Sequence, residues 1–126
     1  MRLFDTHCHF ENADVAEISA IVERARAAGV ERMMAVGGSA LLNESAVAAA
    51  KSQHDLGVIC ALGYDRDQVS VERPVLPMPS EDAGYRIAAY GEIGLDYYYD
   101  FDIWQYGTGQ VDGIEGEVDV NIAIIK

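Results

Sequence analysis

The chain has 126 residues and a formal net charge of −12, with 50% hydrophobic and 24% charged residues. This balance is typical of a soluble globular protein with one core. No stretch approaches the roughly 18 to 20 apolar residues of a membrane span, and no basic patch is available to neutralise the phosphates of a generic nucleic-acid ligand. The two cysteines without Cys-x-x-Cys spacing, and an amino terminus without a signal-peptide pattern, predict a cytoplasmic protein.

The first apolar run, residues 1–6, ends at His7-Cys8-His9. Because side chains alternate faces along a strand, we expect His7 and His9 to project to one face and Cys8 to the other. Two imidazoles on one face can bind a divalent metal ion, but the pair does not say which metal. For an isolated pair, two ordinary surface histidines are an equally good interpretation.

Helical and strand-like segments then alternate along the chain. Asp14 and Glu17 have the capping-box spacing that begins a helix, and Gly29 stands where a glycine typically follows a helix end. Residues 33–36, 58–62 and 87–90 predict further strands, and residues 43–53 predict a second helix. All three prolines lie within residues 65–84, which predict a loop.

Apolar strands that alternate with amphipathic helices predict βαβ units and a mainly parallel sheet, and hence an α/β fold. Glycines and polar residues accompany the carboxyl ends of the predicted strands, at residues 5–9, 37–38, 63–65 and 91–96. In parallel α/β folds the chemistry gathers at the carboxyl ends of the strands, so we expect the functional site at this edge.

Three segments together resemble the TatD family of metal-dependent hydrolases, which are generally described as DNases with an amidohydrolase-type (β/α)8 barrel. They are residues 4–10 (Phe-Asp-Thr-His-Cys-His-Phe), 28–30 (Ala-Gly-Val) and 91–98 (Gly-Glu-Ile-Gly-Leu-Asp-Tyr-Tyr). The resemblance covers residues 1–99, and residues 100–126 form a divergent acidic tail. It implies that His7 and His9 bind one divalent metal ion and that Glu92 bridges it to a second. Magnesium, manganese and zinc are not distinguished.

Physical reasoning agrees with these roles. Glu92 ends a predicted strand, so its carboxylate can meet the two imidazoles at the same edge of the sheet. Two ions that share a carboxylate can activate water and clamp a phosphate, and they supply positive charge that an acidic chain lacks. Asp5 and Asp96 are expected to orient an imidazole or fix a loop, with a purely structural role at least as good. No residue is an obvious general base, so the catalytic residues stay unassigned.

The chain departs from the family pattern in two respects. Gly63-Tyr64-Asp65-Arg66 stands where the family usually carries Gly-x-His-Pro, which puts a phosphate- or substrate-contacting position in doubt. Two further histidine ligands and a late aspartate lie on later strands of the family, beyond residue 126. His54 falls between the second helix and the third strand, where a surface histidine is the better interpretation. We therefore expect a partial TIM-type barrel of about four strands, since a full one takes roughly 250 residues.

Four parallel strands cannot close a barrel, so two edges and an apolar inner surface would be exposed. Residues 118–124 alternate between apolar and polar and predict a tail strand, which could cover one edge. Self-association into a homo-oligomer could cover the other. The primary functional expectation is phosphodiester hydrolysis on DNA by metal-activated water. The alternatives are a non-catalytic truncated remnant that acts as an interaction fragment, and an amidohydrolase-type hydrolase of an amide or lactone.

Overall fold

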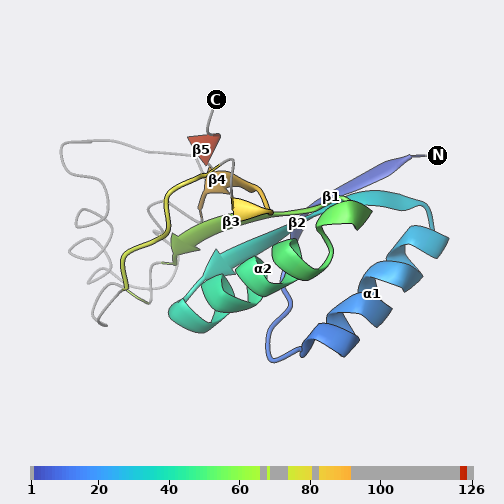
Figure 1. Cartoon of the computed structure of the whole chain (residues 1–126), viewed down its shortest axis with the longest axis horizontal. Helices are drawn as coiled ribbons and strands as arrows, with labels where there is room; N and C mark the ends of the chain where they lie inside the picture. Colours follow the sequence, from blue (N-terminus) through green and yellow to red (C-terminus); the bar gives the residue numbers. More distant parts are fainter. Residues whose placement is uncertain (1, 66–67, 69–73, 81–82, 92–122, 125–126) are drawn as a thin grey trace, which may run out of the picture.

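A computed structural model describes residues 2–65, 68, 74–80, 83–91 and 123–124. Within these residues one sheet has the strand order β1-β2-β3-β4-β5 (Figure 1). The strands are β1 (Leu3–Cys8), β2 (Val30–Gly38), β3 (Val58–Tyr64), β4 (Ile87–Tyr90) and β5 (Ala123–Ile124). The first four pair in parallel, and β5 pairs with β4 in the antiparallel sense.

The order of the parallel strands distinguishes between the two common α/β architectures. A doubly wound sheet reverses its strand order at a switch point, whereas a (β/α)8 barrel places each strand beside the next one along the chain. Strands β1 to β4 follow chain order. The predicted partial TIM-type barrel of about four strands is therefore confirmed. Of the predicted tail strand, the part before residue 123 lies outside the described residues.

Helix α1 (Val15–Ala27) begins where the sequence predicts. The Asp14 carboxylate accepts hydrogen bonds from the backbone N–H groups of Ala16 and Glu17, and the Glu17 carboxylate accepts one from the Asp14 N–H. This reciprocal capping satisfies donors that the first helical turn leaves without partners. Gly29 follows the helix end with φ of 98°, a left-handed conformation that glycine adopts without steric cost.

Helix α2 (Ala40–Ser52) begins three residues earlier than the predicted residues 43–53. The reason is Ser39, whose hydroxyl oxygen accepts a hydrogen bond from the Leu42 N–H at 3.2 Å and so caps the helix. Strand β2 is likewise longer than the predicted residues 33–36. At its amino end, β2 reaches back to Val30, because Val30 already pairs with Leu3 of β1. A short 3-10 helix, η1 (His54–Leu56), precedes β3.

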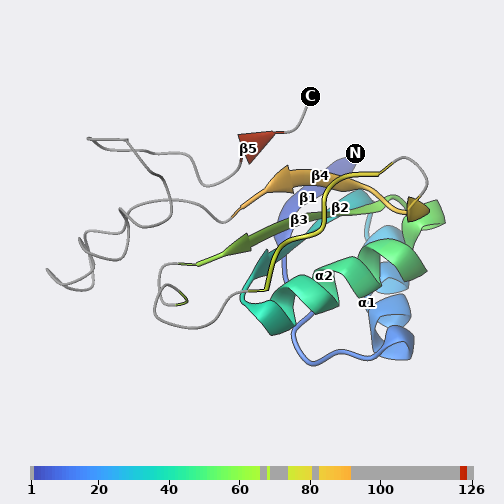
Figure 2. The ribbon, with the colours of Figure 1, turned by 60° about the vertical axis from the view of Figure 1, so that its left-hand side comes forward.

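Both helices cover one face of the sheet, and the main core lies between them and the strands (Figures 1 and 2). The buried side chains of this cluster include Ile18, Val22, Ala46, Ala49, Val58, Cys60, Leu62 and Ile87. A separate, smaller cluster comprises Val36, Ala61 and Ala89 with Met34 against it. Because neighbouring strand residues alternate between the two clusters, the sheet buries apolar side chains on both faces, as parallel sheets typically do.

All three prolines lie in residues 74–80, which form neither a helix nor a strand, in agreement with the predicted loop. In Figure 2 this proline segment (yellow) runs beside α2. The Tyr64 hydroxyl donates a hydrogen bond to the Pro74 carbonyl oxygen at 2.6 Å, and the Tyr90 hydroxyl donates one to the Pro77 carbonyl oxygen at 2.9 Å. Two tyrosines from the ends of β3 and β4 thus hold the segment against the helical layer.

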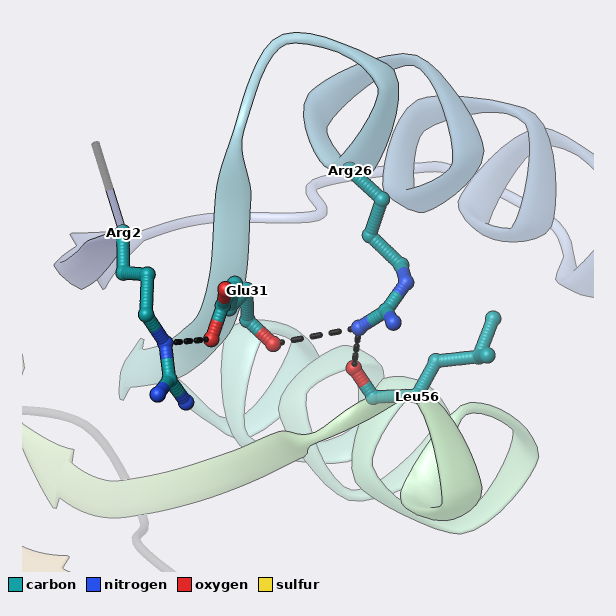
Figure 3. A network of polar contacts seen from close by, with 4 residues as sticks. All are labelled: Arg2, Arg26, Glu31 and Leu56. Atoms are coloured by element: carbon teal, nitrogen blue, oxygen red, sulfur yellow. Dashed lines mark hydrogen bonds and ion pairs between the residues drawn. The ribbon is translucent and has the colours of Figure 1, made fainter.

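Arg26 joins three elements at the amino edge of the sheet (Figure 3). Its Nη1 donates to the carbonyl oxygens of Glu31 at 3.1 Å and Leu56 at 2.8 Å, which links the end of α1 to β2 and η1. Arg2 pairs with the Glu31 carboxylate at 2.6 Å, but the two side chains are 86% and 43% exposed. An exposed ion pair adds little stability, so the Arg26 contacts are the stronger constraint of the two.

Replacing Arg26 by alanine is expected to lower the free energy of unfolding by about 1 kcal/mol, because two carbonyl oxygens lose a charged donor. The measurement is urea-induced unfolding. Arg24→Ala is the matched control, since Arg24 lies in the same last turn and its side chain makes no hydrogen bond within the described residues. Equal unfolding midpoints for the two variants would contradict the role given to Arg26.

Candidate metal site at the carboxyl end of the sheet

Two histidines meet at the carboxyl end of β1. The Nε2 atoms of His7 and His9 lie 3.2 Å apart, and their ring centroids are separated by 4.9 Å. Cys8, between them, packs against the helix-side core instead. The prediction that the two imidazoles share one face and Cys8 the other is confirmed.

The proton positions on His9 follow from its surroundings. Its Nδ1 lies 2.9 Å from the Val36 carbonyl oxygen, which accepts hydrogen bonds and cannot donate them. Nδ1 therefore carries the proton, and Nε2 of the neutral ring presents its lone pair. A backbone carbonyl that holds the second ring nitrogen in this way is the usual support of a metal-binding histidine.

The separation of the two Nε2 atoms fits a shared metal ion. Two nitrogen ligands at about 2.1 Å from one ion, as in zinc sites, are 3.2 Å apart when they subtend an angle of roughly 100°. The same separation also suits a hydrogen bond donated by His7 to His9, so the distance is compatible with both arrangements. The donor set itself suits a divalent transition metal, because imidazole nitrogen is a favoured ligand of such ions.

Asp5 acts on the backbone of the site. Its Oδ1 accepts a hydrogen bond from the His7 N–H at 3.1 Å and so fixes the end of β1. This is the structural contact that the sequence offered as one interpretation of Asp5. The group that orients His9 is the Val36 carbonyl, which sequence reasoning missed because every residue carries a carbonyl.

Cys8 is not suited to metal binding at neutral pH. Burial, with a further contribution from the negative charge of Asp5, raises the pKa of its thiol from 9.0 to about 12. The thiol donates a hydrogen bond to the Met34 carbonyl oxygen at 3.3 Å. Since the thiolate is the form that binds metals, Cys8 is a packing residue.

The remaining predicted residues contribute no third ligand in the described structure. Glu92 and Asp96 lie outside the described residues. Within those that are described, no group of three His, Cys, Asp or Glu side chains is placed to hold a metal ion. His54 is exposed in η1, 3.6 Å from Asp55, at the opposite edge of the sheet.

Asn43 lies against the carboxyl ends of β2 and β3. Its side-chain amide donates to the Gly63 carbonyl oxygen at 2.7 Å and accepts from the Gly63 N–H at 3.0 Å, and the residue is only 7% exposed. A Cβ on Gly37 would overlap the Asn43 side-chain oxygen, so glycine is required there. Asp65 then follows β3, with its N–H bonded to the Gly38 carbonyl oxygen at 2.7 Å. Sequence reasoning missed Asn43, since only the fold shows that it faces Gly63.

Parallel strands in chain order, with helices over one face and two converging imidazoles at the carboxyl end of β1, define a barrel-type α/β protein with a candidate metal site. The family model for TatD-related DNases matches residues 4–105. The chain therefore belongs to the TatD family. At the level of the family, this makes it a DNase-like hydrolase, and the family is generally metal-dependent. Searches of curated proteins and of solved structures found no match. Among the described helices, none has the length and apolar character to cross a membrane.

The contact between Gly37 and Asn43 can be tested with a double-mutant cycle. Gly37→Ala is expected to cost about 2 kcal/mol or more, because the new methyl group displaces the Asn43 amide and leaves the Gly63 peptide groups unpaired. In an Asn43→Ala background the same change meets an empty space and should cost close to nothing. Urea unfolding of the four proteins measures the coupling. Additive costs would show that Asn43 does not dictate the glycine.

Proposed function

We propose that this protein is a metal-dependent hydrolase of phosphodiester bonds in DNA. His7 and His9 hold one divalent ion, and Glu92 is a ligand of both this ion and a second one. The observation that supports the proposal is the pairing of the two Nε2 atoms at 3.2 Å, with the His9 tautomer set by Val36. Membership of a family of DNase-like hydrolases supplies the substrate class.

The chain's own residues prepare the site for this chemistry. The Val36 carbonyl keeps the proton on Nδ1 of His9, so Nε2 stays available as a ligand. Asp5 holds the backbone of His7 in place. When bound, the divalent ions supply Lewis-acid activation of water and charge neutralisation at the phosphate. The location we propose is the cytoplasm, because both cysteines are free thiols, as expected in a reducing compartment.

Activity on a short single-stranded DNA tests the proposal. With manganese or magnesium present, His7→Ala, His9→Ala and Glu92→Gln are each expected to lower the cleavage rate by at least about 100-fold, because each removes a metal ligand. A chelator should abolish cleavage by the unaltered protein. His54→Ala, at the opposite edge of the sheet, is the matched histidine control and should retain full activity.

Each contrary result favours a different alternative. Equal cleavage by the unaltered protein and the ligand variants would indicate a contaminating nuclease. Metal binding without cleavage of DNA, but with turnover of an amide or lactone, would support the broader amidohydrolase-type activity. No metal binding and no cleavage would leave the non-catalytic interaction fragment as the better account.

We also propose that the chain self-associates through the edge of β1 that has no partner strand within the described residues. This strand ends the described sheet, and its large apolar residues Leu3 and Phe4 are 41% and 45% exposed. An unpaired strand edge with exposed apolar side chains is a template for pairing with another chain.

Light scattering at micromolar concentration is expected to give the mass of a dimer or larger oligomer. Phe4→Lys should shift the population to the monomer, because a charge on an edge strand opposes pairing. Val15→Lys is the control, since Val15 is 56% exposed on α1, away from this edge. A monomeric unaltered protein would refute the proposal.

A further inference from the structure

A cavity of about 400 Å³ lies on the helix side of the sheet, between α2 and the proline segment. Leu62 of β3 lines it together with Val47 and Ala48 of α2, and Pro74 and Leu76 contribute from the proline segment. Leu62 belongs to the helix-side core, whereas His7 and His9 point to the other face. The cavity is therefore separate from the candidate metal site.

The wall formed by the proline segment is restrained in two ways. The hydroxyl groups of Tyr64 and Tyr90 donate hydrogen bonds to the carbonyl oxygens of Pro74 and Pro77, respectively. The segment is therefore fixed at two points three residues apart. Proline also fixes its own φ and confines the residue before it to extended conformations, which applies to Leu76 before Pro77. A cavity with such a wall is largely preformed, and its volume falls in the range of about 300–1,000 Å³ typical of small-molecule sites.

Two charged residues of opposite sign reach the cavity from α2. Lys51 lies with its Nζ 5.0 Å from the centroid of the Tyr85 ring, a cation–π contact that already engages this charge. Glu44 is exposed and makes no ion pair within the described part of the chain. With a net charge of −12 on the protein, the potential around Glu44 favours a cationic ligand group over an anionic one.

We propose that this cavity binds a small amphiphilic amine. Its aromatic or branched alkyl body lies between α2 and the proline segment, in contact with Leu62 and Val47. Its ammonium group pairs with the Glu44 carboxylate at the rim. This site goes beyond the proposed hydrolase function and does not depend on it.

Three probes that differ mainly in charge test the proposal by calorimetric titration of the full chain: 2-phenylethylamine, 2-phenylethanol and 3-phenylpropionate. The amine is expected to bind at least about fivefold more tightly than the alcohol, because an ammonium–carboxylate contact is a charge-assisted hydrogen bond. The carboxylate probe should bind weakest. Glu44→Gln should remove the preference for the amine and leave affinity for the alcohol unchanged.

Two further variants separate the site from general effects. Ala48→Leu places a larger side chain in the cavity and should abolish binding of all three probes; Val47→Phe serves the same purpose if the first variant does not fold. Glu23→Gln on α1 changes the net charge equally and should keep the preference for the amine. No binding by any probe at millimolar concentration would overturn the proposal. So would a preference for the carboxylate probe, or undiminished binding in folded cavity-filling variants.

Discussion

The parallel register of β1, β2 and β3 is the constraint on which the candidate site depends. Pairing of Cys8 with Ala35 brings the end of β1 beside the Val36 carbonyl, which is the hydrogen-bond partner of His9. Pairing of Gly38 with Tyr64 aligns the end of β2 with that of β3. A slip by one residue would turn each side chain to the other face and move the imidazoles into the helical core.

Alternation between the faces assigns neighbouring residues to different tasks. Cys8 is half-buried on the helix side, where its thiol pKa of about 12 keeps it neutral, whereas the adjacent histidines bring their Nε2 atoms together on the other face. Leu62 likewise packs under α2 while Ala61 faces the small cluster on the opposite side. Each face can therefore carry its own function, one through imidazoles and the other through the cavity beside α2.

Local signals in the sequence predicted local structure well, and long-range contacts less so. Asp14, Glu17 and Gly29 act within a few residues of themselves, so the bounds of α1 could be read from their spacing. The predicted start of α2 is three residues late, because Ser39 is followed three residues later by Leu42 and so lacks the capping-box pattern that marks α1. The bonds of Asn43 to Gly63 span 20 residues and exist only once α2 has packed on β3. No pattern along the chain indicates such a contact.

The distribution of charge bears on how an acidic protein could act on DNA. The basic residues in the described part lie at or near the amino edge of the sheet: Arg2, Arg24, Arg26, Arg32, Lys51 and Arg86. The carboxyl edge instead has Asp14 and Glu17 at the start of α1, Glu44 at the start of α2 and Asp65 after β3. This arrangement attracts divalent cations to the histidine edge and repels phosphates from it.

Arg26 is moreover committed to two backbone carbonyl oxygens, so it is not available to a phosphate. If DNA is the substrate, metal ions must therefore serve binding as well as catalysis, because the described part of the chain offers no other positive charge at this edge.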